Sequence, residues 1–376
     1  MSAKLDDNKL LFVTGTRADY GKLEPLALAA VEAGYQVTFF VTGMHMMAQY
    51  GLTKMEVHRR SEFRVVEYTN QRHGDPQDAV FAKTLTGFSD FIQEHKPDLV
   101  IIHGDRIESL ACSLVCSTNY IRCAHVEGGE VSGTIDEQFR HCNTKLSSVH
   151  LVSSEEARGR VIRMGESPDA VHVIGSPELD IHARPTDLTI DQVLDRYEIL
   201  SRDYGICIFH SVTSELDTID VQAASLFQAL VDSNRYYVVI LPNNDPGSDA
   251  IKKVIDELPT ERFRVLPSMR FSYFSLLMRS ASAIIGNSSM GVREAPFLGV
   301  PSLDIGTRQS NRGMASSLKQ CKAQDRTSID RFIANDWGCR YPCSKSFGSG
   351  NAAQHFVKLL DSGVFWSSPM QKYFAA

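Results

Sequence analysis

The alternation of short apolar runs with helical patterns is the feature that most constrains how this chain can fold. The runs 98–102 (DLVII) and 122–126 (RCAHV) are short, apolar and bounded by polar residues, as expected for buried parallel strands. Further strands are predicted at 9–13, 36–41, 63–68, 149–153, 171–174, 205–209, 236–241, 262–266, 283–286 and 301–305. Because helical patterns lie between them, the chain predicts an α/β fold with doubly wound parallel sheets.

The length of the chain predicts two domains. At 376 residues it exceeds one ordinary domain, and 43% hydrophobic residues suffice for packed cores. The segment 175–188 is interrupted by Pro177 and Pro185 and is predicted to be the interdomain linker. The last predicted strand is 301–305, and the segments 352–360 and 369–373 look helical.

Charge, hydropathy and cysteine spacing exclude several classes of protein. The net charge of −6 argues against a nucleic-acid-binding surface, and no apolar run approaches the length of a membrane span. The first residues run directly into a strand without the pattern of a signal peptide. The eight cysteines show neither a CxxC pair nor the spacing of metal ligands. These features predict a reduced, cytoplasmic protein.

Three acids follow the two central strands. Asp105 comes after the run 98–102, Glu127 comes after the run 122–126, and Asp136 opens the next helical pattern. Ligands of open α/β sheets bind beyond the carboxyl ends of the strands, so the three acids can converge on one crevice. Neighbouring carboxylates are costly unless a substrate, a cation or a shared proton compensates, and acid–base catalysis uses that arrangement. The alternative is that polar residues simply occupy strand ends.

Polar turns containing glycine follow other predicted strands. Residues 14–22 (TGTRADYGK) contain Arg17 and Lys22 and open a helix, where backbone N–H groups and the helix dipole attract anions. Ser288 and Ser289 occupy a comparable turn further along the chain. The turn at 14–22 has neither the spacing of a dinucleotide fingerprint nor that of a P-loop, so it is a weak signal by itself. The alternative for the serines is an ordinary helix cap.

Arg308 and Arg312 follow the last predicted strand and suit a diphosphate, since guanidinium groups bind phosphate through paired hydrogen bonds. A solvated surface pair is the alternative. Two α/β domains with polar strand ends imply a cleft between them, with carboxylates on the N-terminal side and serines and arginines on the C-terminal side. That division is typical of a site for a nucleotide-sugar.

The assembled motifs resemble those of the hydrolysing UDP-N-acetylglucosamine 2-epimerases of bacterial sialic-acid biosynthesis, over nearly the whole chain. They are GTRADYGK (15–22), VTGMHM (41–46), HGDR (103–106), HVEGGE (125–130), TIDEQFRH (134–141), IGSPELD (174–180), GNSSMGVREAP (286–296) and GTRQSNR (306–312). The resemblance implies two Rossmann-like domains in the glycosyltransferase-B arrangement, residues 1–178 and 179–361, with the active site in the interdomain cleft. A last helix, about 362–376, would pack back on the first domain.

The resemblance also implies roles for individual residues. The catalytic acids map onto Asp105, Glu127 and Asp136, and a histidine of the second domain maps onto His210. Asp136 departs from the non-hydrolysing relatives, which typically carry Glu there. The contacts to UDP map onto Arg17, Lys22, Arg106, Ser288, Ser289, Glu294 and Arg308. Of these, Glu294 would hold the ribose hydroxyls. A homodimer is implied, and neither a metal nor a redox cofactor is.

The implied reaction converts UDP-GlcNAc and water to N-acetylmannosamine and UDP. The C2 proton is removed while UDP leaves C1, and the resulting 2-acetamidoglucal is then hydrated. The alternatives are the same chemistry on UDP-diacetamido-bacillosamine in legionaminic-acid synthesis, a non-hydrolysing epimerase that returns UDP to the glucal, a glycosyltransferase of the same fold, and a non-catalytic nucleotide-sugar sensor.

Overall fold

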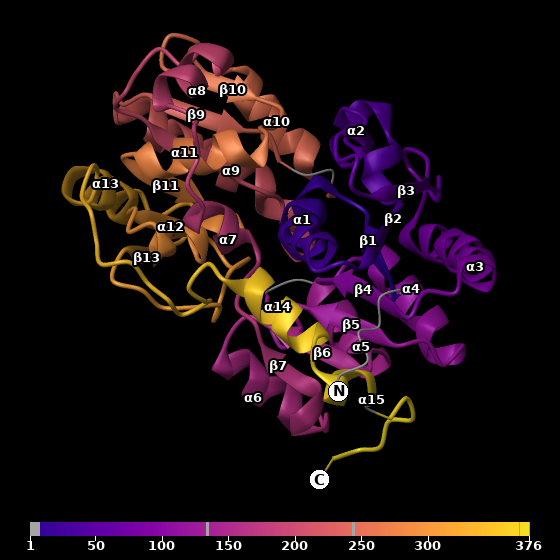
Figure 1. Ribbon diagram of the computed structural model, residues 1–376. Coiled ribbons are helices and arrows are strands. Elements are labelled where there is room, and N and C mark those ends of the chain that lie inside the picture. Colours follow the sequence, from indigo (N-terminus) through magenta and orange to yellow (C-terminus); the bar gives the residue numbers. More distant parts are fainter. Residues whose placement is uncertain (1–7, 133–134, 243–244, 368, 376) are drawn as a thin grey trace. The chain divides into compact units, whose positions relative to one another are not determined.

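The computed structural model describes residues 8–132, 135–242, 245–367 and 369–375, so Thr134 of the TIDEQFRH motif lies outside the described residues. The chain divides into two compact units (Figure 1). The first comprises Met1–Glu130, Asp136–Ala183 and Phe347–Ala376, and the second comprises Val131–Ile135 and Arg184–Ser346. The main part of the second unit therefore begins after Ala183, and the chain returns to the first unit at Phe347, whereas the sequence placed these points at 178 and near 362.

The first unit contains a parallel sheet with the strand order β3-β2-β1-β4-β5-β6-β7. Its strands are β1 (Lys9–Thr14), β2 (Gln36–Val41), β3 (Arg64–Glu67), β4 (Leu99–His103), β5 (Cys123–Val126), β6 (Val149–Val152) and β7 (Val171–Val173). Its helices are α1 (Arg17–Glu32), α2 (Lys54–His58), α3 (Gln77–His95), α4 (Ile107–Thr118), α5 (Asp136–Leu146), α6 (Glu155–Arg163), α7 (Glu178–Ala183), α14 (Ala352–Leu360) and α15 (Gly363–Ser367).

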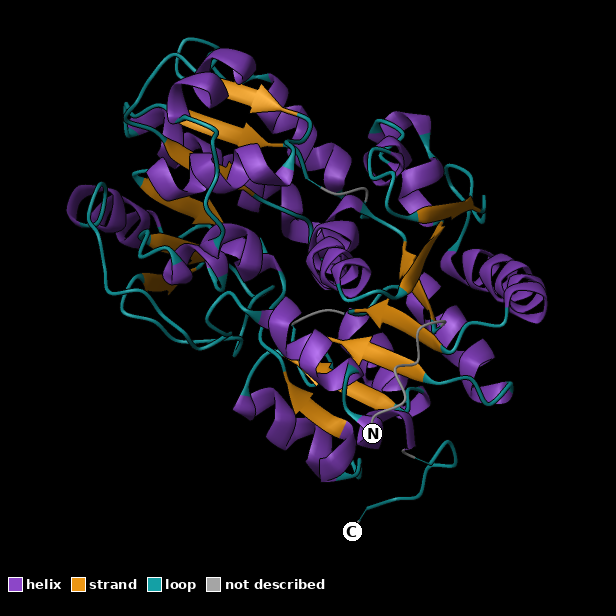
Figure 2. Ribbon diagram, viewed as in Figure 1, coloured by secondary structure: helices purple, strands orange, loops and turns teal. Residues whose placement is uncertain are grey.

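Helices cover both faces of this sheet (Figure 2). Successive strand residues point to opposite faces, so Leu10 and Phe12 enter one core, with α1 and α14, while Leu11 and Val13 enter the other, with α3 and α4. Burial on both faces explains why these strands read as uninterrupted apolar runs.

The second unit repeats this plan with the strand order β10-β9-β8-β11-β12-β13, again parallel. Its strands are β8 (Gly205–Ile208), β9 (Tyr237–Ile240), β10 (Phe263–Leu266), β11 (Ala283–Gly286), β12 (Ser302–Ile305) and β13 (Leu318–Cys321). Its helices are α8 (Ile190–Tyr197), α9 (Ile219–Asp232), α10 (Ser248–Asp256), α11 (Phe271–Ser280), α12 (Glu294–Phe297) and α13 (Arg326–Asn335). Cys207 and Ile206 point into separate cores on its two faces.

Two local predictions were wrong, and a third was right only in part. The strand at 301–305 is not the last, because the edge strand β13 follows it. The sequence of β13 is not an apolar run, since the strand is half exposed. The segment 369–373 contains no helix. The predicted linker 175–188 does contain the passage between the units, after Ala183, but part of it is α7, a buried helix of the first unit. Within α7, the two carboxylate oxygens of Asp180 each accept a 2.8 Å hydrogen bond from the first backbone N–H groups of α14.

Within the described residues, no helix is both long enough and apolar enough to span a bilayer.

Candidate active site

A line of alternating charges lies at the carboxyl ends of β4 and β5. His103, the last residue of β4, places its Nδ1 3.0 Å from Asp19 Oδ1 and its Nε2 3.2 Å from Glu127 Oε2. Lys22 Nζ lies 2.9 Å from Glu127 Oε1 and 3.7 Å from Glu178 Oε1. Asp19 and Lys22 come from α1 and Glu178 from α7, so four segments far apart in the sequence build one ionic cluster.

The charges in this cluster stabilise one another. Burial raises the pKa of Asp19, but the hydrogen bond and the attraction from His103 outweigh it and lower that pKa to about 2. Burial lowers the pKa of His103, but Glu127 and Asp19 outweigh it and raise that pKa above its ordinary value. The geometry therefore favours an imidazolium that is hydrogen-bonded to Asp19 on one side and ion-paired with Glu127 on the other.

Glu127 is held in a conformation that non-glycine residues rarely adopt. Its φ is +66°, in the left-handed region, which costs roughly 1–2 kcal/mol for a residue with a Cβ. The backbone N–H of Glu127 donates to Leu151 O at 3.0 Å, and Gly129 follows with a φ of +75°. A Cβ at Gly129 would lie 2.4 Å from Ala157 O, so the turn is tightly enclosed. Strain of this kind persists where the surroundings determine the conformation, as they do at functional sites.

Asp105 pairs with a different cation. The Arg140 guanidinium of α5 forms an ion pair with the Asp105 carboxylate and donates through Nη1 to Glu130 O at 3.2 Å. One turn further, Asn143 Nδ2 donates to Gly104 O at 3.1 Å. These contacts fasten α5 to the end of β4, and Asp136 is the first residue of that helix. Arg140 is fully buried, and the sequence reasoning missed it because only its partner follows a strand.

The predicted acids thus have partners that the sequence did not identify. Asp105 and Glu127 follow neighbouring strands, since His103 and Val126 are register partners in the β4–β5 ladder. The cost of placing carboxylates there is offset by cations of the protein itself, Arg140 for Asp105 and the Lys22–His103 pair for Glu127.

Arg17 follows β1 and Arg106 follows β4, the neighbouring strand of the same sheet. Arg17 Nε donates to Glu56 Oε2 of α2 at 3.1 Å, and Arg106 Nε lies 3.4 Å from Glu108 Oε2. Their side chains are 29% and 28% exposed, so both guanidinium groups also face solvent. Each guanidinium group is therefore already paired with a carboxylate of the protein.

The VTGMHM motif has a structural role. His45 bridges Thr14 Oγ1 at 2.9 Å and Thr53 Oγ1 at 2.7 Å, and burial lowers its pKa to about 4, so the ring is neutral at pH 7. Gly43 has a φ of +63°, and a Cβ there would lie 2.7 Å from Gly15 O. The loops after β1 and β2 therefore pack with their backbones in contact.

The second unit gathers its predicted residues around Asn287, which the sequence reasoning named only as part of a motif. Asn287 Oδ1 accepts from His210 N at 2.7 Å, and Asn287 Nδ2 donates to His210 O at 2.8 Å. The backbone O of Asn287 accepts from Arg308 Nη1 at 3.3 Å and from Gln309 Nε2 at 2.8 Å. Asn287 thus joins the loops that follow β8, β11 and β12.

His210 is uncharged in this setting. Burial first, and then the charge of Arg308, lower its pKa well below the ordinary value. Ser288 precedes and Ser289 begins a 3-10 turn, and Glu294 is buried at the start of the short helix α12. Each of these segments is a single turn, so the turn that contains the serines does not open directly into a long helix.

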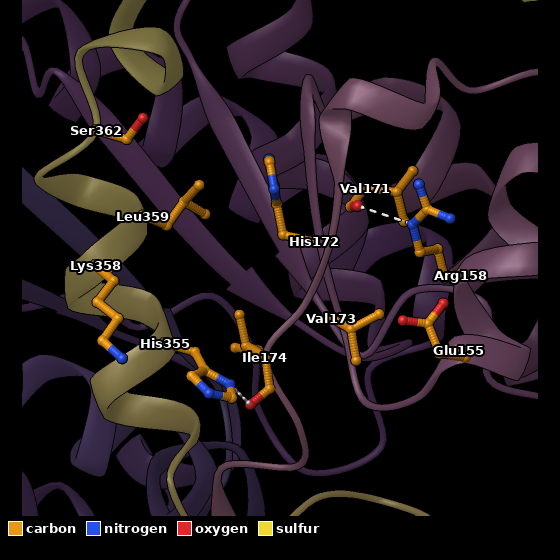
Figure 3. Close-up of a pocket in the computed structure, with 10 residues that line it drawn as sticks. All are labelled: Glu155, Arg158, Val171, His172, Val173, Ile174, His355, Lys358, Leu359 and Ser362. Carbon is orange, nitrogen blue, oxygen red and sulfur yellow. Dashed lines mark hydrogen bonds between the residues drawn. The ribbon is translucent and has the colours of Figure 1, made fainter.

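A hollow of about 480 Å³ lies elsewhere in the first unit, beside the edge strand β7 (Figure 3). Its lining comes from α6, β7 and α14 and includes Arg158, His172 and His355. Arg158 Nε and His355 Nδ1 lie within hydrogen-bond distance of the edge-strand carbonyls of Val171 and Ile174. The predicted site residues all lie in the described part of the chain, and none of them is among the lining residues.

Solved structures share the fold of the chain. The crystal structure of UDP-GlcNAc 2-epimerase from Neisseria meningitidis bound to UDP-GlcNAc matches with a TM-score of 0.79 at 20% identity, over 94% of this chain and 99% of that one. The Methanocaldococcus jannaschii UDP-GlcNAc 2-epimerase in complex with UDP-GlcNAc and UDP matches with a TM-score of 0.73 at 18% identity, over 94% and 99%. The predicted fold class, two Rossmann-like α/β domains of the glycosyltransferase-B type, is confirmed.

Sequence relatives extend over almost the full length. A UDP-N-acetylglucosamine 2-epimerase of Neisseria meningitidis serogroup B is 39% identical, over 97% of this chain and 98% of the relative. A UDP-N,N'-diacetylbacillosamine 2-epimerase (hydrolyzing) of Legionella pneumophila is 34% identical over the same shares. Polysialic acid biosynthesis protein P7 of Escherichia coli is 32% identical over 82% and 81%. The family model of UDP-N-acetylglucosamine 2-epimerase matches residues 29–361, and the chain belongs to that family.

Proposed function

We propose that this protein is a hydrolysing 2-epimerase that converts UDP-GlcNAc and water to N-acetylmannosamine and UDP, the first step of sialic-acid synthesis. The observation that carries the proposal is the buried Glu127 carboxylate between Lys22 and His103, on the strand next to that of Asp105. Positioned carboxylates serve as general acids and bases. Family membership supports 2-epimerase chemistry, and the meningococcal and polysialic-acid relatives support the sugar and the pathway.

The proposed reaction has two balanced stages. A base takes the C2 proton, the electron pair of the C2–H bond forms a C1–C2 double bond, and the C1–O bond breaks so that UDP leaves. Water then adds its oxygen to C1, and a proton returns to C2 from the opposite face. Removal and return on opposite faces require at least two positioned acid–base groups, a role that we assign to the set Asp105, Glu127 and Asp136.

Cations and polar groups would hold the leaving nucleotide. We assign contacts with UDP to Arg17, Lys22, Arg106, Ser288, Ser289, Glu294 and Arg308. Arginine suits the diphosphate because its planar guanidinium donates paired hydrogen bonds. His210, which is neutral, would stabilise the developing phosphate charge by donating an N–H hydrogen bond rather than by its own charge. Glu294 would accept hydrogen bonds from the ribose hydroxyls.

A second candidate substrate is UDP-diacetamido-bacillosamine, with the same elimination and hydration. The relative from Legionella pneumophila, 34% identical over 97% of this chain, carries that activity in its name and favours this candidate. The two substrates differ at the sugar carbons away from C1 and C2. The same acid–base groups would therefore serve both, and only a direct comparison of turnover separates them.

The reaction predicts isotope incorporation at C2. We expect that UDP-GlcNAc incubated with the protein in D2O yields N-acetylmannosamine with deuterium at C2, together with one equivalent of free UDP, because the proton that returns comes from solvent. Proton NMR follows both products in one tube, and a parallel tube contains UDP-diacetamido-bacillosamine. Product without C2 deuterium would remove the elimination mechanism, and UDP-N-acetylmannosamine as the end product would make the enzyme non-hydrolysing.

Nucleotide binding is predicted to depend on the second unit. Arg308→Ala should weaken UDP binding by about 1.5–3 kcal/mol, the usual worth of a hydrogen bond to a charged group. Glu294→Ala should weaken UDP but leave pyrophosphate unchanged, because its proposed partner is ribose. Calorimetry with UDP and pyrophosphate measures both, with the exposed Arg326 of α13 changed to Ala as the control. Wild-type UDP affinity in both site variants would place the nucleotide elsewhere.

A further inference from the structure

Residues 371–375, named here the strap, cover the carboxyl-terminal end of α5. Lys372 Nζ donates to the backbone O atoms of Thr144 at 3.1 Å, Lys145 at 2.9 Å and Ser147 at 2.6 Å. The last carbonyl groups of a helix have no partner within the helix, and a lysine there satisfies them and offsets the negative end of the helix dipole. Lys372 is therefore a cap for α5 that comes from more than two hundred residues away in the chain.

A buried carboxylate fixes the position of the Lys372 ammonium group. Glu166 Oε2 lies 2.6 Å from Lys372 Nζ and 2.9 Å from His150 Nε2, and Glu166 Oε1 lies 2.6 Å from Lys145 Nζ. Burial raises the pKa of Glu166, but the hydrogen bonds from His150, Lys145 and Lys372 outweigh it and lower that pKa to about 2. The strap thus closes an ionic cluster that also contains Lys145, a residue of α5.

The strap has a second anchor on the turn after α6. Ala375 N donates to Gly165 O at 3.0 Å, and the Phe374 ring lies against Gly165, where a Cβ would come within 2.2 Å of the ring. Gly165 has a φ of +85°, so both its backbone conformation and this contact require glycine. Lys145 Nζ lies 5.9 Å from the centre of the Phe374 ring.

The other end of α5 contains groups of the candidate active site. Asp136 begins the helix, Arg140 pairs with Asp105, and Asn143 is bonded to Gly104 at the end of β4. A short helix fixed at both ends has a defined position along its axis, whereas one held only at its amino end frays from the free end. Fraying of the last turn reaches Asn143, which is the last side chain joining α5 to β4.

We propose that the strap is a positioning element of the enzyme: Lys372 caps α5 and thereby keeps Asp136 and Arg140 aligned with Asp105. This inference rests on the proposed function, because it assigns catalytic value to Asp136 and Asp105. Lys372 and Phe374 are positioning residues, since they act through α5.

The test compares Lys372→Met with Lys358→Met. The first variant keeps the length of the side chain but removes its charge and donors, and the second removes an exposed lysine of α14 as the control. Hydrogen exchange of the amides of residues 143–147, measured without substrate, should accelerate about tenfold in Lys372→Met, as expected for the loss of a charged helix cap. Its kcat should fall about three- to tenfold with KM within about twofold, because α5 is displaced while the nucleotide contacts remain.

A second variant separates the outcomes. Phe374→Ala removes a largely exposed ring, so the protein should fold, and it should show the same changes to a smaller degree. Faster exchange with an unchanged kcat, or unchanged exchange in Lys372→Met, would overturn the positioning role. Failure of the proposed function would show differently: the wild type itself would produce no UDP from the nucleotide-sugar, whereas the exchange of α5 would still respond to Lys372→Met.

Discussion

Glu127→Gln should lower turnover by about a hundredfold or more, the usual contribution of a positioned acid–base group. Glutamine keeps the shape of the side chain, and its single amide oxygen can still accept a hydrogen bond from Lys22, whose Nζ lies 2.9 Å from Glu127 Oε1; the amide NH2 would replace Oε2, which lies 3.2 Å from His103 Nε2. The backbone strain at φ +66° is unchanged, so folding should be preserved. What the variant loses is the negative charge and the ability to exchange a proton with C2 of the sugar. The rate of UDP release under saturating substrate measures the effect.

The control for this substitution is Glu137→Gln. Glu137 follows Asp136 on α5 but pairs with His141 at 3.4 Å, in a half-exposed position. Its variant should retain turnover within about twofold, as is usual for surface substitutions. UDP affinity, measured by calorimetry, should be the same in Glu127→Gln and in the wild type, because the proposed UDP contacts lie mainly in the second unit. A turnover near that of the wild type in Glu127→Gln would remove Glu127 from the catalytic set.

Asp105→Asn should lower turnover to a similar degree and also lower the thermal stability. Arg140 is fully buried and pairs with Asp105, so the neutral side chain leaves the guanidinium without its charged partner. The two variants are therefore expected to differ in melting temperature while resembling each other in rate. If the Asp105→Asn and Glu127→Gln variants melt at the same temperature, the hydrogen bond to Glu130 O and the remaining contacts are enough to stabilise the buried Arg140 guanidinium.

The fold could be predicted from the sequence because its strands carry a local signal. A parallel strand covered on both faces is an uninterrupted apolar run, as β4 and β5 are. The strand β13 lacks that signal since it lies at the sheet edge, half exposed. The helix α7 was missed because prolines bracket it, whereas its burial and its contacts with α14 are tertiary.

The site was predictable only in part, for a related reason. The acids could be found because they follow strands, and strand ends meet at one edge of a sheet. The residues that pair with these acids could not be found from the sequence. The His103–Asp19 pair joins residues 84 positions apart, and the Arg140–Asp105 pair joins a strand end to the second turn of a helix. Asn287 was visible in a motif, but its role in joining three loops depends on strand order, which the sequence does not state.

Asp19→Asn should move the alkaline limb of the pH–rate profile to lower pH by about one unit, a change of about 1.4 kcal/mol in the free energy of protonating His103. The pKa of His103 is raised because Glu127 and Asp19 together outweigh the effect of burial. Removing one of these two carboxylates lowers that pKa. Above that pKa the ring is neutral and its ion pair with Glu127 is lost, so the Glu127 carboxylate loses part of its charge compensation at a lower pH in Asp19→Asn than in the wild type.

The stability of the same variant has a predictable pH dependence. Because the pKa of His103 is higher in the folded protein than in the unfolded chain, His103 contributes to stability. This contribution is complete below the unfolded-state pKa and is lost as the pH rises through the folded-state pKa. Asp19, whose pKa is lowered to about 2 in the folded protein, also contributes to stability. This contribution is present above the unfolded-state pKa and is lost as the pH falls through the folded-state pKa. The destabilisation by Asp19→Asn should therefore be largest between about pH 4 and pH 6.5, the model-compound values of the two groups, and smaller at higher pH.

Denaturant unfolding at three pH values and the pH–rate profile test both expectations on one pair of proteins. The matched control is Asp98→Asn, which changes a carboxylate that accepts from Lys9 N at 2.8 Å at the exposed end of the sheet, away from His103. That variant should show neither a shifted alkaline limb nor the same pH-dependent destabilisation. If the alkaline limb is the same in Asp19→Asn and in the wild type, the protonation of His103 does not govern turnover. The ionic cluster from Asp19 to Lys22 would then contribute to the stability of the fold but not to the reaction.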